Sequence, residues 1–286
     1  MTRERCSDGC LRRGDLIGAS APPVHHWVLI EQPGPWGPDA LWESALTPKV
    51  ARSVTEQAAE IGARVLLIRR PGRSGPGPRQ WALVDARRER LWWNEFDDHD
   101  ELLDLGLADP RGEPSEEPVY LVCTHGRHDT CCAVRGRPVA AALAATRPGR
   151  AWECSHVGGD RYAANLLVLP HGFYFGQVEA RAAAGIADEF EAGRLDLPRL
   201  RGRSTFPPAA QAAQQFVRER TGVRDLDSYT PVSVERVAHE EWDVELADGW
   251  LVRVRAVFER SDTPLTCRAR VPAAIRHFEP VSVRRR

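Results

Sequence analysis

The feature that most constrains the fold is an apolar run followed by a helical pattern and then by a second apolar run. HHWVLIEQP (25–33) is rich in Trp, Val, Leu and Ile and is stopped by a proline, which is typical of a buried strand. Residues 47–63 have the spacing of an amphipathic helix, and Thr47 is a good residue to cap its first turn. RVLLIRR (64–70) is the second apolar run. This succession predicts a βαβ unit whose two strands are parallel.

The order of elements in the first part of the chain recurs in the second part. QWALVD and RLWWNEF complete the first part as antiparallel strands, and the polar, proline-rich segment 109–118 separates the two parts. Strands at 118–123 and 150–156 then flank a helix at 137–146, and a strand pair with a Pro-His-Gly turn follows at 163–178. A further helix ends this part. Two successive patterns of β-α-β and then β-β-α predict an internal duplication of a thioredoxin-like unit.

We therefore predict an α/β fold with two tandem thioredoxin-like units and a small α+β appendage. The appendage begins with an amphipathic helix and continues with a hairpin that turns at Asp248-Gly249. LTCRARV is expected to be another strand, with Cys267 buried in it. The predicted parts are a flexible lead-in at 1–24, an N-terminal thioredoxin-like unit at 25–115, a second thioredoxin-like unit with the candidate site at 116–206, and the α+β appendage at 207–286.

Composition and charge narrow the class of protein. Hydrophobic residues make up 42% of the 286 residues, and the net charge of −1 gives no global attraction to nucleic acid or membranes. No apolar run approaches the ~20 residues of a membrane span, and the first residues lack the apolar core of a signal peptide. We therefore expect a cytoplasmic protein. In that reducing compartment, seven cysteines favour metal or redox chemistry over a disulfide framework.

The stretch CTHGRHDTCC (123–132) concentrates three thiols and two imidazoles in ten residues. Cys123 ends a predicted strand and Cys132 opens the following helix. A loop from a strand end to a helix start presents backbone N–H groups, which stabilise anions. Thiolates are soft ligands that suit iron–sulfur clusters, zinc and copper(I). The stretch is therefore the first half of a candidate metal site.

The second half of the candidate site is expected in CSHVGGDRYAAN (154–165), where Cys154, His156 and Asp160 lie in one loop. Glycines between the last two let the backbone approach a bulky ligand. Two loops at one end of a sheet can face each other. The two loops would then supply two or three thiolates, one imidazole and a carboxylate, with His125 and His128 beside the ligands or on the surface.

Three other readings compete with a cluster. Zinc sites use tighter pairs such as C-x2-C, and the spacing of Cys123 and Cys132 fits that pattern poorly. Thioredoxin-type dithiols use C-x-x-C, whereas Cys131 and Cys132 are adjacent. Buried, inert thiols are the third reading. Two further cysteines, Cys6 and Cys10, lie in the predicted flexible lead-in, and we do not expect them to bind metal.

The residues around the candidate site resemble those of the sucrase/ferredoxin-like family. The resemblance rests on CTHGRHDTCCAVRGRPVAAAL and SHVGGDRYAANLLVLPHGFYFGQV, is supported by WVLIEQPGPWGPDAL, and covers residues 25–200. It implies a thioredoxin-like ferredoxin with a [2Fe-2S] cluster, held by two cysteines of the first loop and two histidines spaced H-x3-H in the second. Carried over, the ligands are Cys123, Cys132 and His156, and Asp160 takes the place of the second histidine. Because carboxylate is an uncommon ligand for such clusters, Cys154 and Cys131 remain alternative ligands.

The resemblance implies one-electron transfer or redox sensing with a redox partner protein. An electron carrier is expected rather than a catalyst, and sucrase activity has no support because no paired carboxylates suit a glycosidase. Two alternatives stay open. One is a metal-free thioredoxin-fold thiol oxidoreductase, and the other is a cluster-free structural or regulatory relative.

Overall fold

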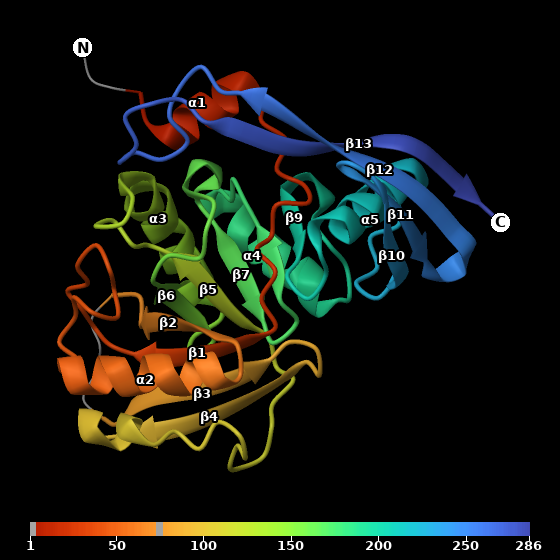
Figure 1. Cartoon of the computed structure of the whole chain (residues 1–286). Helices are drawn as coiled ribbons and strands as arrows, with labels where there is room; N and C mark the ends of the chain where they lie inside the picture. Colours follow the sequence, from red (N-terminus) through yellow and green to blue (C-terminus); the bar gives the residue numbers. More distant parts are fainter. Residues whose placement is uncertain (1–3, 73–76) are drawn as a thin grey trace.

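The computed structural model describes residues 4–72 and 77–286, which form two β-sheets with helices on their faces (Figure 1). The larger sheet has nine strands in the order β4-β3-β1-β2-β6-β5-β7-β8-β9, and the smaller has four in the order β10-β11-β12-β13. The predicted mixed α/β class is therefore confirmed.

The first half of the large sheet begins with the predicted βαβ unit. Thr47 caps the helix α2 as expected, because its side chain accepts a hydrogen bond from the backbone N–H of Val50. Strand β1 is parallel to β2 and antiparallel to β3, which is antiparallel to β4. The elements are β1 (His26–Glu31), α2 (Pro48–Glu60), β2 (Ala63–Arg69), β3 (Arg79–Asp85), β4 (Arg90–Phe96) and the 3-10 helix η1 (His99–Leu103).

The second half of the large sheet repeats this arrangement. Strand β5 is parallel to β6 and antiparallel to β7, which is antiparallel to β8, so the order β8-β7-β5-β6 matches β4-β3-β1-β2. The halves join edge to edge where β2 pairs with β6. The elements are β5 (Val119–Cys123), α3 (Thr130–Thr146), β6 (Ala151–Cys154), η2 (Asp160–Tyr162), β7 (Leu166–Leu169), β8 (Phe173–Phe175), α4 (Ala180–Glu191), η3 (Leu197–Arg199) and β9 (Leu200–Arg203).

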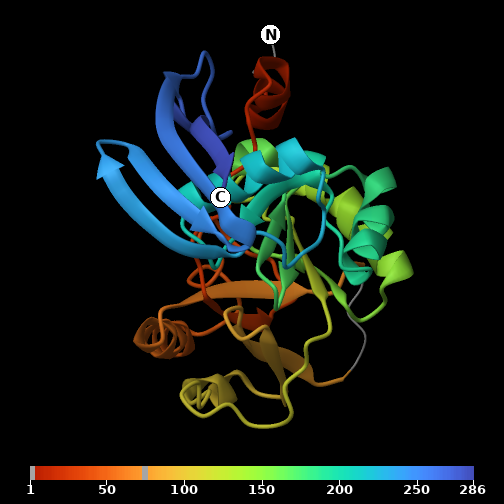
Figure 2. The same cartoon turned by 90° about the vertical axis from the view of Figure 1, so that its right-hand side faces the viewer.

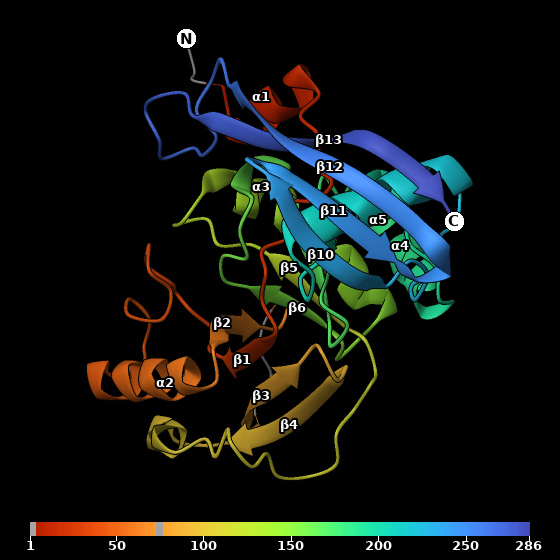
Figure 3. The same cartoon turned by 45° about the vertical axis from the view of Figure 1, so that its right-hand side comes forward.

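The smaller sheet follows and curves over the helix α5, as Figure 3 shows. Its core combines small side chains of α5 with apolar residues of the strands, such as Val244, Val252 and Val254. The predicted hairpin at Asp248-Gly249 is confirmed by the pairing of β11 with β12. The elements are α5 (Pro208–Thr221), β10 (Pro231–Ala238), β11 (Glu241–Leu246), η4 (Ala247–Gly249), β12 (Trp250–Arg260) and β13 (Ala274–Arg285).

Two sequence predictions about the ends of the chain are wrong. Residues 1–24 are not simply a flexible lead-in, because Cys6–Arg13 form the helix α1 and its Cys6 and Cys10 are buried. LTCRARV is not a strand, because it lies in the loop between β12 and β13, where Cys267 is half-buried. Both errors have one cause. Helix α1 and this loop pack on each other and on α3, and such long-range packing leaves no local periodicity to read.

Helix α3 begins at Thr130, which is seven residues before the segment 137–146 expected to be helical and two residues before Cys132, which was expected to open it. Asp129 caps it, since a side-chain oxygen accepts a hydrogen bond from the backbone N–H of Cys131 at 2.8 Å. Both Cys131 and Cys132 therefore lie in the first turn of a helix. Among the helices of 4–72 and 77–286, none is long and apolar enough to cross a membrane.

Candidate metal centre

The candidate centre lies where two parallel strands of the large sheet end. Strand β5 ends at Cys123 and β6 ends at Cys154, and these two residues are partners in the register. Because the strands are parallel, the loops that follow them leave the same edge of the sheet. The predicted juxtaposition of the two loops is therefore a direct consequence of the topology.

The helix α3 approaches the end of β5 very closely. A Cβ atom on Gly136 would lie 2.1 Å from the carbonyl oxygen of Cys123, so only glycine fits at this contact. The approach brings Cys132, in the first turn of α3, against Cys123. Both thiols are almost fully buried.

The loop after β6 contributes an imidazole and a carboxylate. The ligand atoms of Cys123, Cys132 and His156 all lie within 4.8 Å of one another. Nδ1 of His156 is 3.0 Å from Oδ1 of Asp160, and the same oxygen accepts a hydrogen bond from Sγ of Cys132 at 3.4 Å. The structure therefore brings together all four residues that the resemblance selected.

A buried arginine on β9 holds this loop in place. Arg201 donates to the carbonyl oxygen of Gly158 at 2.9 Å and to the side-chain oxygen of Asn165 at 2.7 Å. Asn165 in turn donates to the carbonyl oxygen of Gly159 at 2.9 Å. Gly159 has φ of 83°, and a Cβ there would lie 2.6 Å from Arg201. Gly159 thus allows the approach of a guanidinium, where the sequence suggested the approach of a ligand.

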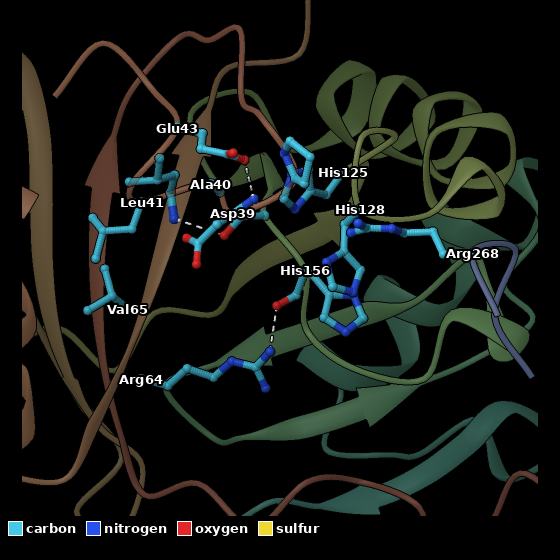
Figure 4. Close-up of a pocket in the computed structure, with 13 residues that line it drawn as sticks. Asp39, Ala40, Leu41, Glu43, Arg64, Val65, His125, His128, His156 and Arg268 are labelled. Carbon is cyan, nitrogen blue, oxygen red and sulfur yellow. Dashed lines mark hydrogen bonds between the residues drawn. The ribbon is translucent and has the colours of Figure 1, made fainter.

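Imidazole rings connect the buried thiols with a surface cavity. The rings of His128 and His156 stack with centroids 3.8 Å apart and planes 19° apart, and His125 lies 5.5 Å beyond His128. A cavity of about 530 Å³ opens over these rings (Figure 4). Arg64 approaches from the opposite side and donates to the carbonyl oxygen of His156. The side chains of His128 and His156 are 32% and 22% exposed, so the site reaches solvent through its histidines.

The charges in the centre favour one thiolate and one imidazolium when no metal is bound. The hydrogen bond from Cys132 outweighs burial and holds the pKa of Cys123 well below the usual value for a thiol. The same hydrogen bond, with burial, raises the pKa of Cys132. Burial lowers the pKa of His156, but interactions with Asp160 and Cys123 outweigh it and raise that pKa to about 9. Anionic donors are therefore available at neutral pH.

The two alternative ligands lie elsewhere. Cys154 is buried in the apolar core beside Trp152 and is not in the group of converging ligand atoms. Cys131 faces a second group, formed with Cys6, Cys267 and Asp129. Adjacent residues of a helix point in directions that do not face the same neighbour. That rule could have shown from sequence that Cys131 and Cys132 serve different sites.

Comparison with known families identifies the chain. Residues 17–202, more than half of its length, match the sucrase/ferredoxin-like family model. The chain belongs to the sucrase/ferredoxin-like family. A search of curated proteins finds no match, and neither does a search of solved structures. The segment shared with the sucrase/ferredoxin-like family contains both loops of the centre but excludes Cys6, Cys267 and the smaller sheet.

Proposed function

We propose that this sucrase/ferredoxin-like protein binds a [2Fe-2S] cluster and uses it for one-electron transfer or redox sensing. One observation carries the proposal. Two thiols and one imidazole, from two loops far apart in sequence, converge within 4.8 Å in a mostly buried site. Nδ1 of His156 is buried there and has no well-aligned hydrogen bond. Its contact with Asp160 at 3.0 Å is an ion pair that is poorly aligned for a hydrogen bond, and coordination to a metal would satisfy the buried nitrogen better.

The donor set fits an iron–sulfur cluster. Thiolates are the usual cluster ligands, and imidazole replaces two of them in clusters of higher potential. When bound, the cluster would supply a one-electron couple. The chain's own residues would hold it with Cys123 and Cys132 on one side and His156 on the other, and burial of both thiols keeps water from them.

We assign the fourth ligand position to Asp160 rather than to Cys154. The Asp160 carboxylate already contacts both Cys132 and His156, at 3.4 Å and 3.0 Å. Interactions with His156 outweigh burial and lower the pKa of Asp160, so it is anionic at neutral pH. Cys154 lies in the sheet within the apolar core, and burial raises its pKa. A carboxylate adds negative charge that a second imidazole would not, so it favours the oxidised cluster.

The fold supports the same proposal. The second half of the large sheet has the β-α-β and β-β-α succession expected of a thioredoxin-like unit, and the first half repeats its strand order. We therefore propose two thioredoxin-like units joined at β2 and β6. The second carries the cluster, and the stacked histidines at the cavity are where a redox partner protein would approach.

Burial argues against a metal-free thiol oxidoreductase. Such an enzyme needs a low-pKa thiol that is also accessible to its substrate. The pKa of Cys123 is lowered, but Cys123 and Cys132 are only 1% and 0% exposed. A protein dithiol cannot reach them without opening of the site.

The test is anaerobic purification followed by visible absorption and counts of iron and acid-labile sulfide. We expect a red-brown protein with about two irons and two sulfides per chain. Cys123→Ser should lose the iron, and Cys154→Ala, which alters the partner of Cys123 in the sheet, should keep it. Loss in Cys154→Ala with retention in Asp160→Ala would reassign the fourth ligand. A colourless wild-type protein that also fails anaerobic reconstitution would overturn the proposal.

A further inference from the structure

A second cluster of thiols lies next to the proposed iron site. The three sulfur atoms of Cys6, Cys131 and Cys267 form a triangle with sides of 3.5, 3.3 and 3.6 Å. The carboxylate of Asp129 lies over it, with both oxygens 3.7 Å from Sγ of Cys6. All four ligand atoms lie within 4.8 Å of one another. Cys6, Cys131 and Asp129 are buried, and Cys267 is half-buried.

Three segments that are far apart in the sequence meet at this cluster. Cys6 opens helix α1, Cys131 lies in the first turn of α3, and Cys267 lies in the loop between β12 and β13. Figure 1 and Figure 2 both show α1 beside the end of the smaller sheet that carries this loop. Asp262 of the loop pairs with Arg12 of α1 at 2.7 Å and with Arg13 at 3.1 Å.

Asp129 faces the thiols and also fixes the backbone of two of the cysteines that carry them. Its Oδ1 accepts a hydrogen bond from the backbone N–H of Cys131 at 2.8 Å, and its Oδ2 accepts one from that of Cys267 at 2.6 Å. Each carboxylate oxygen has a further lone pair for a cation. The N-termini of α1 and α3 both point at the cluster, and the helix dipole stabilises thiolates there. The hydroxyl of Ser7 donates to Sγ of Cys131 at 3.2 Å.

The spacing of the sulfur atoms fits coordination to one ion. Zinc binds thiolates at about 2.3 Å in a tetrahedron, which places neighbouring sulfurs about 3.8 Å apart. The observed 3.3–3.6 Å is close to that edge. A disulfide bond is far shorter, about 2.05 Å. Thiolates of an iron–sulfur cluster that bind separate irons stand farther apart than the ligands of a single ion. Mixed thiolate and carboxylate ligation is within the range of zinc.

We propose that Cys6, Cys131, Cys267 and Asp129 bind a structural zinc ion. All four positions of the tetrahedron are filled by protein, so the site is closed and not catalytic. As the ion binds, the three thiols lose their protons to solvent and coordinate as thiolates. Two of the three thiols lie outside residues 17–202, the segment shared with the family. The site therefore extends beyond the segment that matches the family, and it fastens α1 and the β12–β13 loop to the start of α3.

This zinc site fixes the residue before a proposed cluster ligand. Cys131 and Cys132 are consecutive in the first turn of α3, and each faces a different group. Zinc binding would hold the backbone of this turn and so the position of the Cys132 thiol. We expect the two metals to be separable, because their ligand sets share no residue.

The experiment measures zinc and iron by elemental analysis on the anaerobically purified full-length protein, expressed with zinc in the medium. We expect about one zinc per chain in the wild type, with zinc K-edge absorption giving three sulfurs near 2.3 Å and one oxygen near 2.0 Å. Cys6→Ser and Cys267→Ser should each lower the zinc content at least tenfold while the iron content stays unchanged. Cys10→Ser is the matched control, because Cys10 is buried on the same helix but its sulfur contacts Gln177 instead. It should keep its zinc.

Several results would overturn the zinc site. One is a wild-type protein without zinc, whether its thiols are all free or its mass is two hydrogens short, as in a disulfide. A wild-type protein that contains copper instead of zinc would also overturn it. So would a Cys10→Ser variant whose zinc content falls as far as that of Cys6→Ser. The absorption spectrum of wild-type protein decides the ligands even where a variant fails to fold. A wild-type protein that contains zinc but no iron would count against the cluster and would support the zinc site.

Discussion

Replacing Arg201 with methionine should destabilise the protein and loosen the loop that carries His156 and Asp160. The guanidinium is 1% exposed, and burial lowers its pKa to about 10, so it stays protonated at neutral pH. It makes four hydrogen bonds, to the loop after β6 and to Ser20 of the N-terminal segment. Methionine keeps the length and the apolar packing of the side chain but donates none of them.

The size of the destabilisation follows from the hydrogen-bond acceptors that lose their donor. Three are carbonyl-type oxygens, on Ser20, Gly158 and Asn165, and the fourth is the Ser20 hydroxyl, which also bonds Ile17. A buried acceptor left unpaired costs about 1–3 kcal/mol. The Asn165 oxygen is buried and those of Ser20 and Gly158 are partly buried, and removing the charge relieves its burial cost, so we take the low end of that range. Three oxygens at about 1 kcal/mol each give a loss of about 3 kcal/mol in the free energy of unfolding.

Chemical denaturation of the metal-free protein measures this loss directly. Arg199→Met is the matched control, because Arg199 lies two residues earlier and its guanidinium pairs with Asp196 within its own turn. The two side chains are 28% and 21% exposed, and loss of this partly exposed pair should cost about 1 kcal/mol or less. Arg201→Lys, which keeps the charge but not the planar fork, should fall between the two. If Arg201→Met unfolds within 1 kcal/mol of the wild type, hydrogen bonding by Arg201 does not hold the loop.

Three further predictions concern the centre itself. In the metal-free protein His156 should titrate near pH 9, because Asp160 and Cys123 outweigh burial, and Asp160→Asn should move its pKa back toward 6.5 in an NMR titration. Since that pKa is raised on folding, the stability it contributes is complete below about pH 6.5 and is lost as pH rises through about 9, and Asp160→Asn should flatten this part of the pH profile. Asp160→His should keep the iron and raise the reduction potential in a redox titration, because a neutral imidazole replaces an anionic carboxylate; an unchanged potential would argue that Asp160 is not a ligand. Gly136→Ala should lower the free energy of unfolding by more than 2 kcal/mol and deplete iron, because its Cβ would meet the Cys123 carbonyl oxygen. The control Gly185→Ala has open space around it and should stabilise the protein by about 0.5–1 kcal/mol. Equal effects of the two substitutions would contradict the close approach of α3.

Much of the centre could be predicted from the sequence because its determinants are local. The apolar runs at 25–33 and 118–123 mark strands by their short length and apolar composition, and parallel pairing then sends the loops after β5 and β6 to one edge of the sheet. That rule and the preference of soft metals for thiolate and imidazole predict a site between the two loops, and the resemblance selects Cys123, Cys132 and His156 within it. The place of Asp160 came from the resemblance, and the structure puts its carboxylate in contact with the other ligands.

The tertiary structure decided what depends on packing between distant segments. Nothing in the local pattern around Cys6 or Cys267 indicates that they meet Cys131, since the contacts span 125 and 136 residues. The pairing of β2 with β6, which joins the two halves of the large sheet, is not predictable from local patterns either, because each of these edge strands could have stayed unpaired. The sequence by itself determined most strands and helices of the large sheet, their order and the chemistry of one loop pair, because local patterns and ligand type are properties of neighbouring residues. That Cys6 and Cys267 share a site with Cys131 was decided only by the fold, because packing between distant segments is set by the whole chain.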